Sequence, residues 1–271
     1  MLKREKYILL TLLTVPLLYA GWLLLRCFVF DYFVIPTLSM YPTLKPGDEV
    51  IVNKLLMGAR IYKDFYFNEN GVELKSLRTK GLRPICHNDI VVFNFPHHNW
   101  KVNFVINNVF CKRVVALPGD SISIMNGIYR NNNYDEVLGL EAEQIKYDSL
   151  SKQEHWRKFI QTYPFDYHIN WNVYNFGPMY IPRKGDIINI TPYEATLYKI
   201  FLEWETGLPI GIDWESKTVW VGDRHFIRHK WQHNYYFMAG DNVLDSDDSR
   251  FWGVVPEEYI VGIVDFKFST R

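Results

Sequence analysis

The longest run of apolar positions in the chain lies near its N-terminus. Residues 7–25 read YILLTLLTVPLLYAGWLLL and carry no charged side chain. As a helix, this run would span about 28 Å, close to the thickness of a bilayer core. Lys3, Arg4 and Lys6 precede the run, and Arg26 follows it. Because the more positive flank stays in the cytoplasm, the pattern predicts a membrane anchor with its N-terminus inside and the rest of the chain outside.

A cleaved signal peptide is the alternative interpretation of this run. The run is longer than the usual apolar region of a signal peptide, and no A-x-A cleavage pattern follows it. We therefore expect a retained anchor. No later stretch is long and apolar enough to span a bilayer again. The remaining residues should then form one extracytoplasmic body.

Beyond the anchor, apolar and polar positions alternate as they do in half-buried strands. Val50 and Val52, and likewise Ile122 and Ile124, recur at a spacing of two after a Pro-Gly pair that fits a type II turn. The related segments are LKPGDEVIVNK (44–54), ALPGDSISIM (116–125) and PRKGDIINIT (182–191). Further strands are expected over residues 89–93, 108–116 and 259–268. The predicted fold class is mainly β.

Two segments have helical patterns. Glu141–Tyr163 is polar with few helix breakers. Thr191 and Glu194 form a capping box around Pro192, and Gly207 supplies a stop. Both segments lie in a central region without a recognisable catalytic motif. We therefore expect three parts: a cytoplasmic tip and anchor over 1–28, a catalytic core over 29–125 and 235–271, and an inserted non-catalytic subdomain over 126–234.

Composition narrows the class of protein. Lys and Arg together number 30, as do Asp and Glu, so the formal net charge of zero argues against a nucleic-acid binder held by bulk positive charge. Hydrophobic residues make up 48% and charged residues 22%, which is typical of a globular protein. The three cysteines are too few for a disulfide scaffold and have no CxxC spacing, although one disulfide stays open.

The segment 35–44 has a pattern that suits nucleophilic catalysis. Pro36 and Pro42 fix a non-helical path around Thr37 and Ser39. A serine held in this way can direct both its hydroxyl and its own N–H at one substrate carbonyl. The alternative is a plain turn that leads the chain away from the membrane.

Lys112 is a candidate general base. On the predicted strand 108–116 it shares a face with Phe110 and Val114, while Arg113 points to the other face. Apolar surroundings disfavour the charged amine, so a lysine buried there has a lowered pKa and can accept a proton near neutral pH. The alternative is an edge-strand lysine whose ammonium reaches water.

An aspartate-rich loop over 238–253 resembles a calcium site at first sight. Counting from Asp245, the sixth position is Arg250 instead of Gly and the twelfth is Pro256 instead of Glu, so the EF-hand pattern fails. We expect a hydrogen-bonded loop in which Arg250 pairs with an aspartate, and we expect no metal site.

In series, these motifs resemble the bacterial type I signal peptidases (leader peptidases), a family of Ser-Lys serine proteases. The resemblance covers residues 1–125 and 235–271, and it implies an antiparallel β catalytic core with a smaller inserted domain. The matching motifs are Ser39-Met40-x-Pro42-Thr43-Leu44, Asp89-Ile90-Val91, Lys112-Arg113, Leu117-Pro118-Gly119-Asp120, Gly240-Asp241-Asn242, Asp248-Ser249-Arg250-x-Trp252-Gly253-x-Val255-Pro256 and Val261-Gly262.

The resemblance implies a role for each matching residue. Ser39 would be the nucleophile, Lys112 the general base, and Thr37 with the Ser39 N–H the oxyanion hole. Ser246 would hydrogen-bond the lysine amine. Supporting residues of the same loop would be Asp241, Asp248 and Arg250, the last two as an ion pair. Two residues depart from the family pattern: Val243 replaces a frequent arginine, and Phe110 replaces a frequent tyrosine.

The implied function is that of a membrane-anchored serine endopeptidase that removes signal peptides from exported preproteins. Its place would be the bacterial cytoplasmic (inner) membrane, as a single-pass protein with an extracytoplasmic catalytic domain. The partners implied are preprotein signal peptides and the lipid bilayer, with no nucleic acid and no obligatory protein partner. No metal or organic cofactor is expected.

Three other functions are weaker interpretations. Ser149 and Lys152 form a literal S-x-x-K, but no KTG or SDN motif follows as in penicillin-binding proteins. A self-cleaving repressor peptidase would lack the anchor and the Pro42-Thr43 pair. A catalytically dead binding protein would lack Ser39 or Lys112, and both are present.

Overall fold

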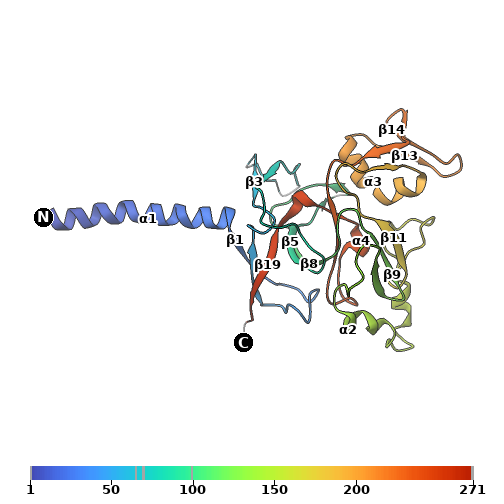
Figure 1. The fold of residues 1–271 in the computed structure, drawn as a ribbon, viewed down its shortest axis with the longest axis horizontal. Helices are drawn as coiled ribbons and strands as arrows, with labels where there is room; N and C mark the ends of the chain where they lie inside the picture. The colour runs from blue at the N-terminus through green and yellow to red at the C-terminus, as the bar shows by residue number, and fades with distance from the viewer. Residues whose placement is uncertain (1, 65, 69–70, 99, 270–271) are drawn as a thin grey trace.

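A computed structural model describes residues 2–64, 66–68, 71–98 and 100–269. Helix α1 (Leu2–Phe28) extends away from a mainly β body (Figure 1). Within it, Glu5–Phe28 has a mean hydropathy of 2.2 and no residue of its most apolar stretch is buried, so its length and composition suit a membrane crossing. The predicted apolar helix is confirmed, and its orientation stays a prediction.

The largest sheet has seven strands, and every neighbouring pair in it is antiparallel. Its strands all come from residues 30–116 and 235–268, so the C-terminal strand inserts between two strands of the N-terminal half. The strands predicted over 89–93, 108–116 and 259–268 are confirmed, as is the strand expected within 44–54. In spatial order the strands are β1 (Phe30–Val34), β2 (Glu49–Asn53), β19 (Ile260–Phe268), β5 (Ile90–Asn94), β8 (Val109–Ala116), β17 (Tyr235–Ala239) and β18 (Val255–Pro256).

Smaller sheets surround this one, mostly in the central part of the chain. β9 (Ser121–Met125) pairs with β10 (Ile128–Asn131) and β11 (Phe176–Tyr180), and so lies with the inserted segment. The remaining short strands are β3 (Arg60–Tyr62) with β4 (Ser76–Arg78), β6 (His97–His98) with β7 (Lys101–Val102), β12 (Ile187–Asn189) with β16 (Arg228–Lys230), and β13 (Ile210–Asp213) with β14 (Thr218–Val221) and β15 (Arg224–His225).

The turn–strand repeats form as the sequence predicts. Gly47, Gly119 and Gly185 all have positive φ, at 89°, 95° and 91°. In β2 the side chains of Val50 and Val52 are fully buried while their neighbours are half-buried. The period-two pattern therefore identified both the turn and the face that enters the core.

One predicted helix is confirmed and the other is wrong. Helix α3 (Pro192–Thr206) starts with the expected capping box at Thr191 and ends at Gly207 in the left-handed region. Glu141–Tyr163 instead forms only α2 (Glu141–Gln144) and two 3₁₀ turns, η1 (Ile145–Tyr147) and η2 (His155–Phe159). Serine and aspartate side chains between the turns compete for local hydrogen bonds, as the Ser149 hydroxyl does with the Lys146 carbonyl.

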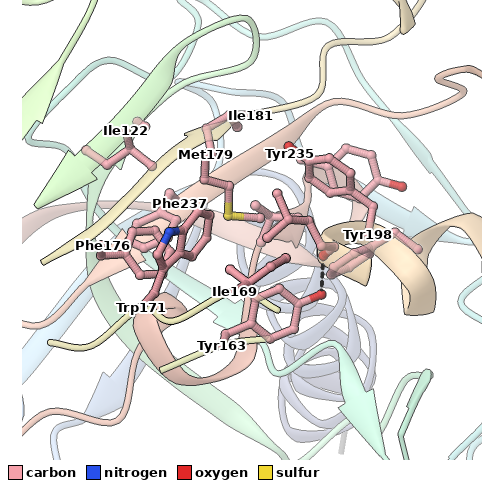
Figure 2. Close-up of a cluster of buried hydrophobic side chains, with 14 of the residues drawn as sticks. Ile122, Tyr163, Ile169, Trp171, Phe176, Met179, Ile181, Tyr198, Tyr235 and Phe237 are labelled. Carbon is pink, nitrogen blue, oxygen red and sulfur yellow. Dashed lines mark hydrogen bonds between the residues drawn. The ribbon is translucent and has the colours of Figure 1, made fainter. Parts of the chain in front are cut away.

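The inserted segment and the sheet share one hydrophobic core. Figure 2 shows Tyr235 and Phe237 of β17 among side chains of the central segment, including Trp171 and Met179. The rings of Phe176 and Phe237 lie 5.5 Å apart, edge to face. Burying one such side chain contributes about 1.5–3 kcal/mol. This shared core fixes the inserted segment against the strands that bear the site.

Two short C-terminal elements complete the fold. Helix α4 (Ser249–Trp252) begins at Asp248, whose carboxylate caps it, and the 3₁₀ turn η3 (Glu257–Tyr259) precedes β19. The loop between β17 and α4, residues 240–248, returns to the sheet beside β8.

Candidate active site

The loop between β1 and β2 presents Ser39 at the edge of the sheet. Its two ends are tied together, because the Ile35 N–H donates to the Asp48 carbonyl at 2.8 Å. Met40 and Leu44 are buried beneath it and fix its path, while Thr37 is exposed. The Ser39 hydroxyl is therefore held at the surface of a packed loop.

Lys112 lies in the middle of β8, between β5 and β17. Its residue is only 3% exposed. Its Nζ donates to the Ser39 Oγ at 2.5 Å, across 73 residues of chain. The two residues that the sequence singled out separately are thus brought into direct contact.

Burial lowers the pKa of Lys112, because the charged amine loses its hydration in the interior. The carboxylates of Asp248 and Asp247 partly oppose this effect, and Arg250 adds to it. The amine's hydrogen-bond partner is a neutral hydroxyl and not a carboxylate. The neutral amine, which can accept a proton, is therefore favoured relative to a lysine in water.

Two groups that can donate a hydrogen bond lie next to the Ser39 hydroxyl, namely the Thr37 hydroxyl and the Ser39 N–H. The Thr37 Oγ1 lies 3.2 Å from the Ser39 Oγ. In the part of the chain that the structure describes, the Ser39 N–H donates to no acceptor. Asn242 steadies this turn from below, since its N–H donates to the Ser39 carbonyl at 3.1 Å and its side chain to the Leu38 carbonyl at 3.2 Å.

Two buried ion pairs support the site. Arg250 binds Asp248 in a bidentate manner, with both distances at 2.8 Å, and both side chains are almost fully buried. The expected ion pair is therefore present. The Asp248 carboxylate also accepts from the Gly240 N–H at 3.0 Å. This pair fixes the loop 240–248 that passes beside the dyad.

The second ion pair joins the strand of Lys112 to the loop 240–248, and Thr43 connects the Ser39 loop to it. Arg113 donates to both carboxylate oxygens of Asp241, at 2.7 and 2.6 Å. The Thr43 hydroxyl donates to the same carboxylate. Sequence reasoning assigned no role to Arg113 or Thr43. The sequence did contain a signal for Arg113. It follows Lys112 on a strand, so its side chain must point to the opposite face.

Ser246 differs from the sequence expectation. The resemblance implies a hydrogen bond to the Lys112 amine, yet the Ser246 hydroxyl is buried without a hydrogen-bond partner among the described residues. It lies against Gly240, where an added Cβ would come within 2.0 Å of its Oγ and 2.4 Å of the Ser39 carbonyl. Ser246 is thus next to the dyad, but the expected bond to the Lys112 amine is not formed.

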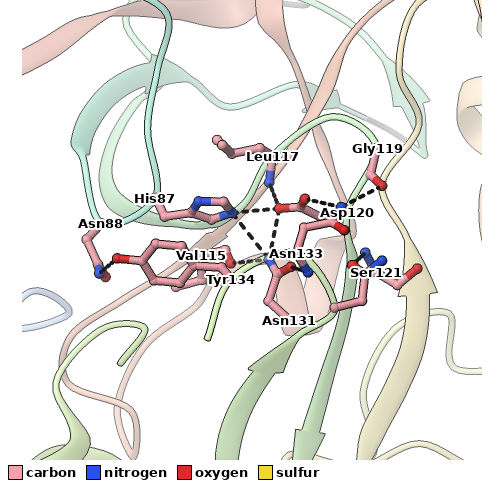
Figure 3. Close-up of polar contacts among 11 residues, drawn as sticks. His87, Asn88, Val115, Leu117, Gly119, Asp120, Ser121, Asn131, Asn133 and Tyr134 are labelled. Atoms are coloured by element: carbon pink, nitrogen blue, oxygen red, sulfur yellow. Dashed lines mark hydrogen bonds and ion pairs between the residues drawn. The ribbon is translucent and has the colours of Figure 1, made fainter. Parts of the chain in front are cut away.

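The turn after β8 is fixed by a polar network around Asp120 (Figure 3). Its carboxylate accepts from the Leu117 N–H at 2.8 Å and from the side chains of Asn131 and Asn133 at 2.8 and 3.0 Å. The His87 Nε2 lies 2.7 Å from the same carboxylate. The network joins the strand that bears Lys112 to β10 of the inserted segment.

The dyad opens into a cleft of about 440 Å³. It is lined by residues 35–40, by residues 109–112, and by Asp245 and Asp247. A larger cavity of about 570 Å³ lies between Lys101–Asn103 and the end of α3, and includes neither dyad residue. The described residues contain no group of three or more metal-binding side chains. Cys27, Cys86 and Cys111 are all free.

A serine hydroxyl in contact with a buried lysine amine defines the class of serine hydrolases that use this pair. Residues 5–269 match the family described as "Signal peptidase, peptidase S26", so the chain belongs to that family. It is a serine endopeptidase. The match extends through the central segment, which no sequence motif covered.

Relatives named signal peptidase I match most of the chain. One from Buchnera aphidicola subsp. Acyrthosiphon pisum is 29% identical over 267 residues, covering 96% of this chain and 74% of that protein. One from Aquifex aeolicus is 24% identical over 242 residues, covering 89% and 76%. A solved signal peptidase I from Enterococcus faecalis is 17% identical with a TM-score of 0.32, covering 68% of this chain and 100% of that one.

Proposed function

We propose that this protein is a membrane-anchored endopeptidase that removes signal peptides from exported preproteins by Ser-Lys acyl-enzyme chemistry. The observation that supports this most directly is the 2.5 Å contact between the Lys112 Nζ and the Ser39 Oγ. A general base must lie within hydrogen-bond reach of the proton it removes, and this amine does. Membership of the peptidase S26 family supports the substrate class.

The reaction follows from the proton positions. The neutral Lys112 amine takes the Ser39 proton as the Oγ attacks the scissile carbonyl. The tetrahedral intermediate collapses, the C–N bond breaks, and Lys112 returns the proton to the leaving amine of the mature protein. Lys112 then removes a proton from water, which attacks the acyl-enzyme ester. The signal peptide leaves with a carboxylate, and Ser39 regains its proton.

The remaining predicted site residues have supporting roles in this proposal. The Thr37 hydroxyl and the Ser39 N–H would hold the oxyanion. Asp248 with Arg250, and Asp241 through Arg113, would keep the loop and the strand in register. From the family resemblance, Ser246 would hydrogen-bond the Lys112 amine during the reaction. The scheme requires no metal and no organic cofactor.

The substrate would lie in the cleft as an extended chain. Residues 35–40 and 109–111 give its walls a mainly apolar character, which suits small side chains at the first and third positions before the cut. An extended peptide can pair with an exposed strand edge and place alternate side chains in shallow pockets. No nucleic-acid or obligatory protein partner is part of this proposal.

We also propose the placement and division of the chain. Residues 1–28 would anchor it in the bacterial inner membrane with the N-terminus cytoplasmic. Residues 29–125 and 235–271 would be the catalytic core, and 126–234 an inserted non-catalytic subdomain. The pairing of β9 with β10 and β11 supports a boundary a few residues earlier, near Ser121.

The dyad is tested by paired alanine variants. Ser39→Ala and Lys112→Ala should each reduce preprotein cleavage to near background, and the double variant should be no worse, because each disables the same unit. Ser149→Ala and Lys152→Ala, from the S-x-x-K that lies elsewhere, are the matched controls and should cleave normally. Wild-type-like cleavage by Ser39→Ala or Lys112→Ala would show that these two residues are not the catalytic dyad.

A further inference from the structure

The charges along the cleft are unevenly balanced. Of the aspartates around the dyad, Asp241 and Asp248 are each paired with an arginine through two hydrogen bonds. Asp245 and Asp247 line the cleft, are exposed, and form no hydrogen bond or ion pair through their carboxylates within the described residues. Lys112 is the cationic residue among those that line the cleft.

The two free carboxylates come from one segment of the cleft lining. They lie on the loop 240–248, whose backbone is fixed by Arg250 and by the contact of Asn242 with Ser39. The other lining residues, 35–40 and 109–111, bear no charge. The lining of the cleft is therefore neutral at 35–40 and 109–111 and acidic at Asp245 and Asp247, and Ser39 and Lys112 line the same cleft. A peptide bound across Ser39 places the residues before its cut on one side and those after the cut on the other.

We infer that Asp245 and Asp247 form an acidic wall that selects substrates with a basic residue just after the cut. This inference rests on the proposed function, which places small neutral residues before the cut and so assigns them to the neutral part of the lining. A lysine or arginine at the start of the mature chain would be attracted by the wall. A glutamate or aspartate there would be repelled, because like charges close together disfavour binding.

The test uses peptides that share one sequence before the cut and differ only at the first residue after it, as Lys, Gln or Glu. For the full-length enzyme in detergent, the kcat/KM ratio of the Lys to the Glu peptide should be about 5- to 20-fold at low salt, as for a few partly exposed charge pairs. It should fall toward one in Asp245→Asn/Asp247→Asn. Asp223→Asn removes an exposed charge in the β14–β15 turn and should keep the wild-type ratio.

Each other outcome would overturn the acidic wall. These are a wild-type ratio near one, a ratio that persists in the double variant, an equal loss in Asp223→Asn, or a charge preference located before the cut. Added salt should also reduce the wild-type ratio, which tests the wall without any variant. Cleavage of the Gln peptide by wild type and not by Ser39→Ala tests the proposed function separately, so the two ideas can fail independently.

Discussion

At the scale of single residues, the three cationic side chains at the site differ in their partners. Arg113 and Arg250 each bind one buried aspartate in a bidentate manner. Lys112 contacts a neutral hydroxyl and is not hydrogen-bonded to a carboxylate. Arginine keeps its charge in such places, whereas a buried lysine can lose it. The type of each cation therefore matches its task, since two arginines hold the loop and, in the proposed mechanism, the lysine moves a proton.

The Lys112 pKa gives a prediction for the pH profile. Asp247 raises the pKa of Lys112 against the larger lowering by burial. In Asp247→Asn the amine should lose its proton at a lower pH, so the rise of kcat/KM with pH should move to lower pH. Asp245→Asn removes a carboxylate from the same cleft and should move the profile less. The test measures kcat/KM against pH with the neutral Gln peptide. If the rise in kcat/KM for Asp247→Asn occurs at the wild-type pH or at a higher pH, the prediction is wrong.

Ser246 and Ser249 should respond oppositely to removal of the hydroxyl. The Ser249 Oγ accepts from the buried Met238 N–H at 2.9 Å. Ser249→Ala should therefore lower the free energy of unfolding by about 1–3 kcal/mol, by leaving that N–H without a partner. The Ser246 hydroxyl has no partner to lose among the described residues. Because an unpaired buried hydroxyl is costly, Ser246→Ala should keep or raise the free energy of unfolding.

The effect of Ser246→Ala on catalysis is the sharper measurement. A buried hydroxyl without a partner is costly, and its presence beside the dyad suggests a partner in another step of the reaction. We expect kcat to fall about 5- to 150-fold, as for loss of one buried hydrogen bond in the transition state, with little change in KM. A wild-type kcat for Ser246→Ala would show that Ser246 has no role in the reaction.

At the scale of elements, the packing of β6 against α3 joins the core to the inserted segment through His97. Its ring lies 5.5 Å from that of Phe201 on α3, and its Nε2 is buried without a hydrogen-bond partner among the described residues. Burial lowers the pKa of His97 to about 4. The neutral ring is thus the form that the folded protein accepts.

This burial predicts an acid-sensitive fold. Because the folded pKa of His97 lies below its ordinary value of 6.5, stability is fully present above pH 6.5 and is lost as the pH falls toward 4. His97→Phe should remove up to about 3 kcal/mol of that loss. Denaturant unfolding from pH 7 to 4 measures it, with His155→Phe at an exposed position as the control. If the free energy of unfolding falls equally with pH in the wild type and in both variants, His97 is not the cause of the acid sensitivity.

At the scale of the whole molecule, helix α1 and the body meet at a small junction. Trp22 packs edge to face against Phe30, with ring centroids 5.7 Å apart. Arg26 binds Asp31 at 2.6 Å, and the Lys54 Nζ donates to the Arg26 carbonyl at 2.7 Å. These contacts set the direction in which the helix leaves the sheet. None of them belongs to the core of the body.

Removal of residues 1–28 should therefore leave a folded and active domain. Its kcat/KM on short soluble peptides should stay within about threefold of the full chain, while cleavage of membrane-embedded preproteins should fall about 10-fold or more, because the anchor supplies effective concentration. Assays on both substrates, with the full chain in detergent and in vesicles as controls, test this. Equal losses on both substrates would make the helix part of the fold.

The sequence by itself determined the local features of the protein. Spacing of apolar residues identified α1, the paired turns and strands, and the buried face of β2, because these depend on neighbours a few residues apart. The capping box of α3 was equally local. Glu141–Tyr163 was predicted wrongly for the same reason, since its polar pattern contains no information about the core that the segment packs against.

Only the tertiary structure decided which distant residues meet. Residue chemistry left Lys112 open between a base and an edge-strand lysine, and the motif series supplied the pairing by resemblance alone. The contact of Lys112 with Ser39 spans 73 residues, and that of Arg113 with Asp241 spans 128. Such contacts follow from strand order and register, which are set by burial of the whole sheet and not by any short pattern. The absent Ser246 bond and the acidic wall are features of the same kind.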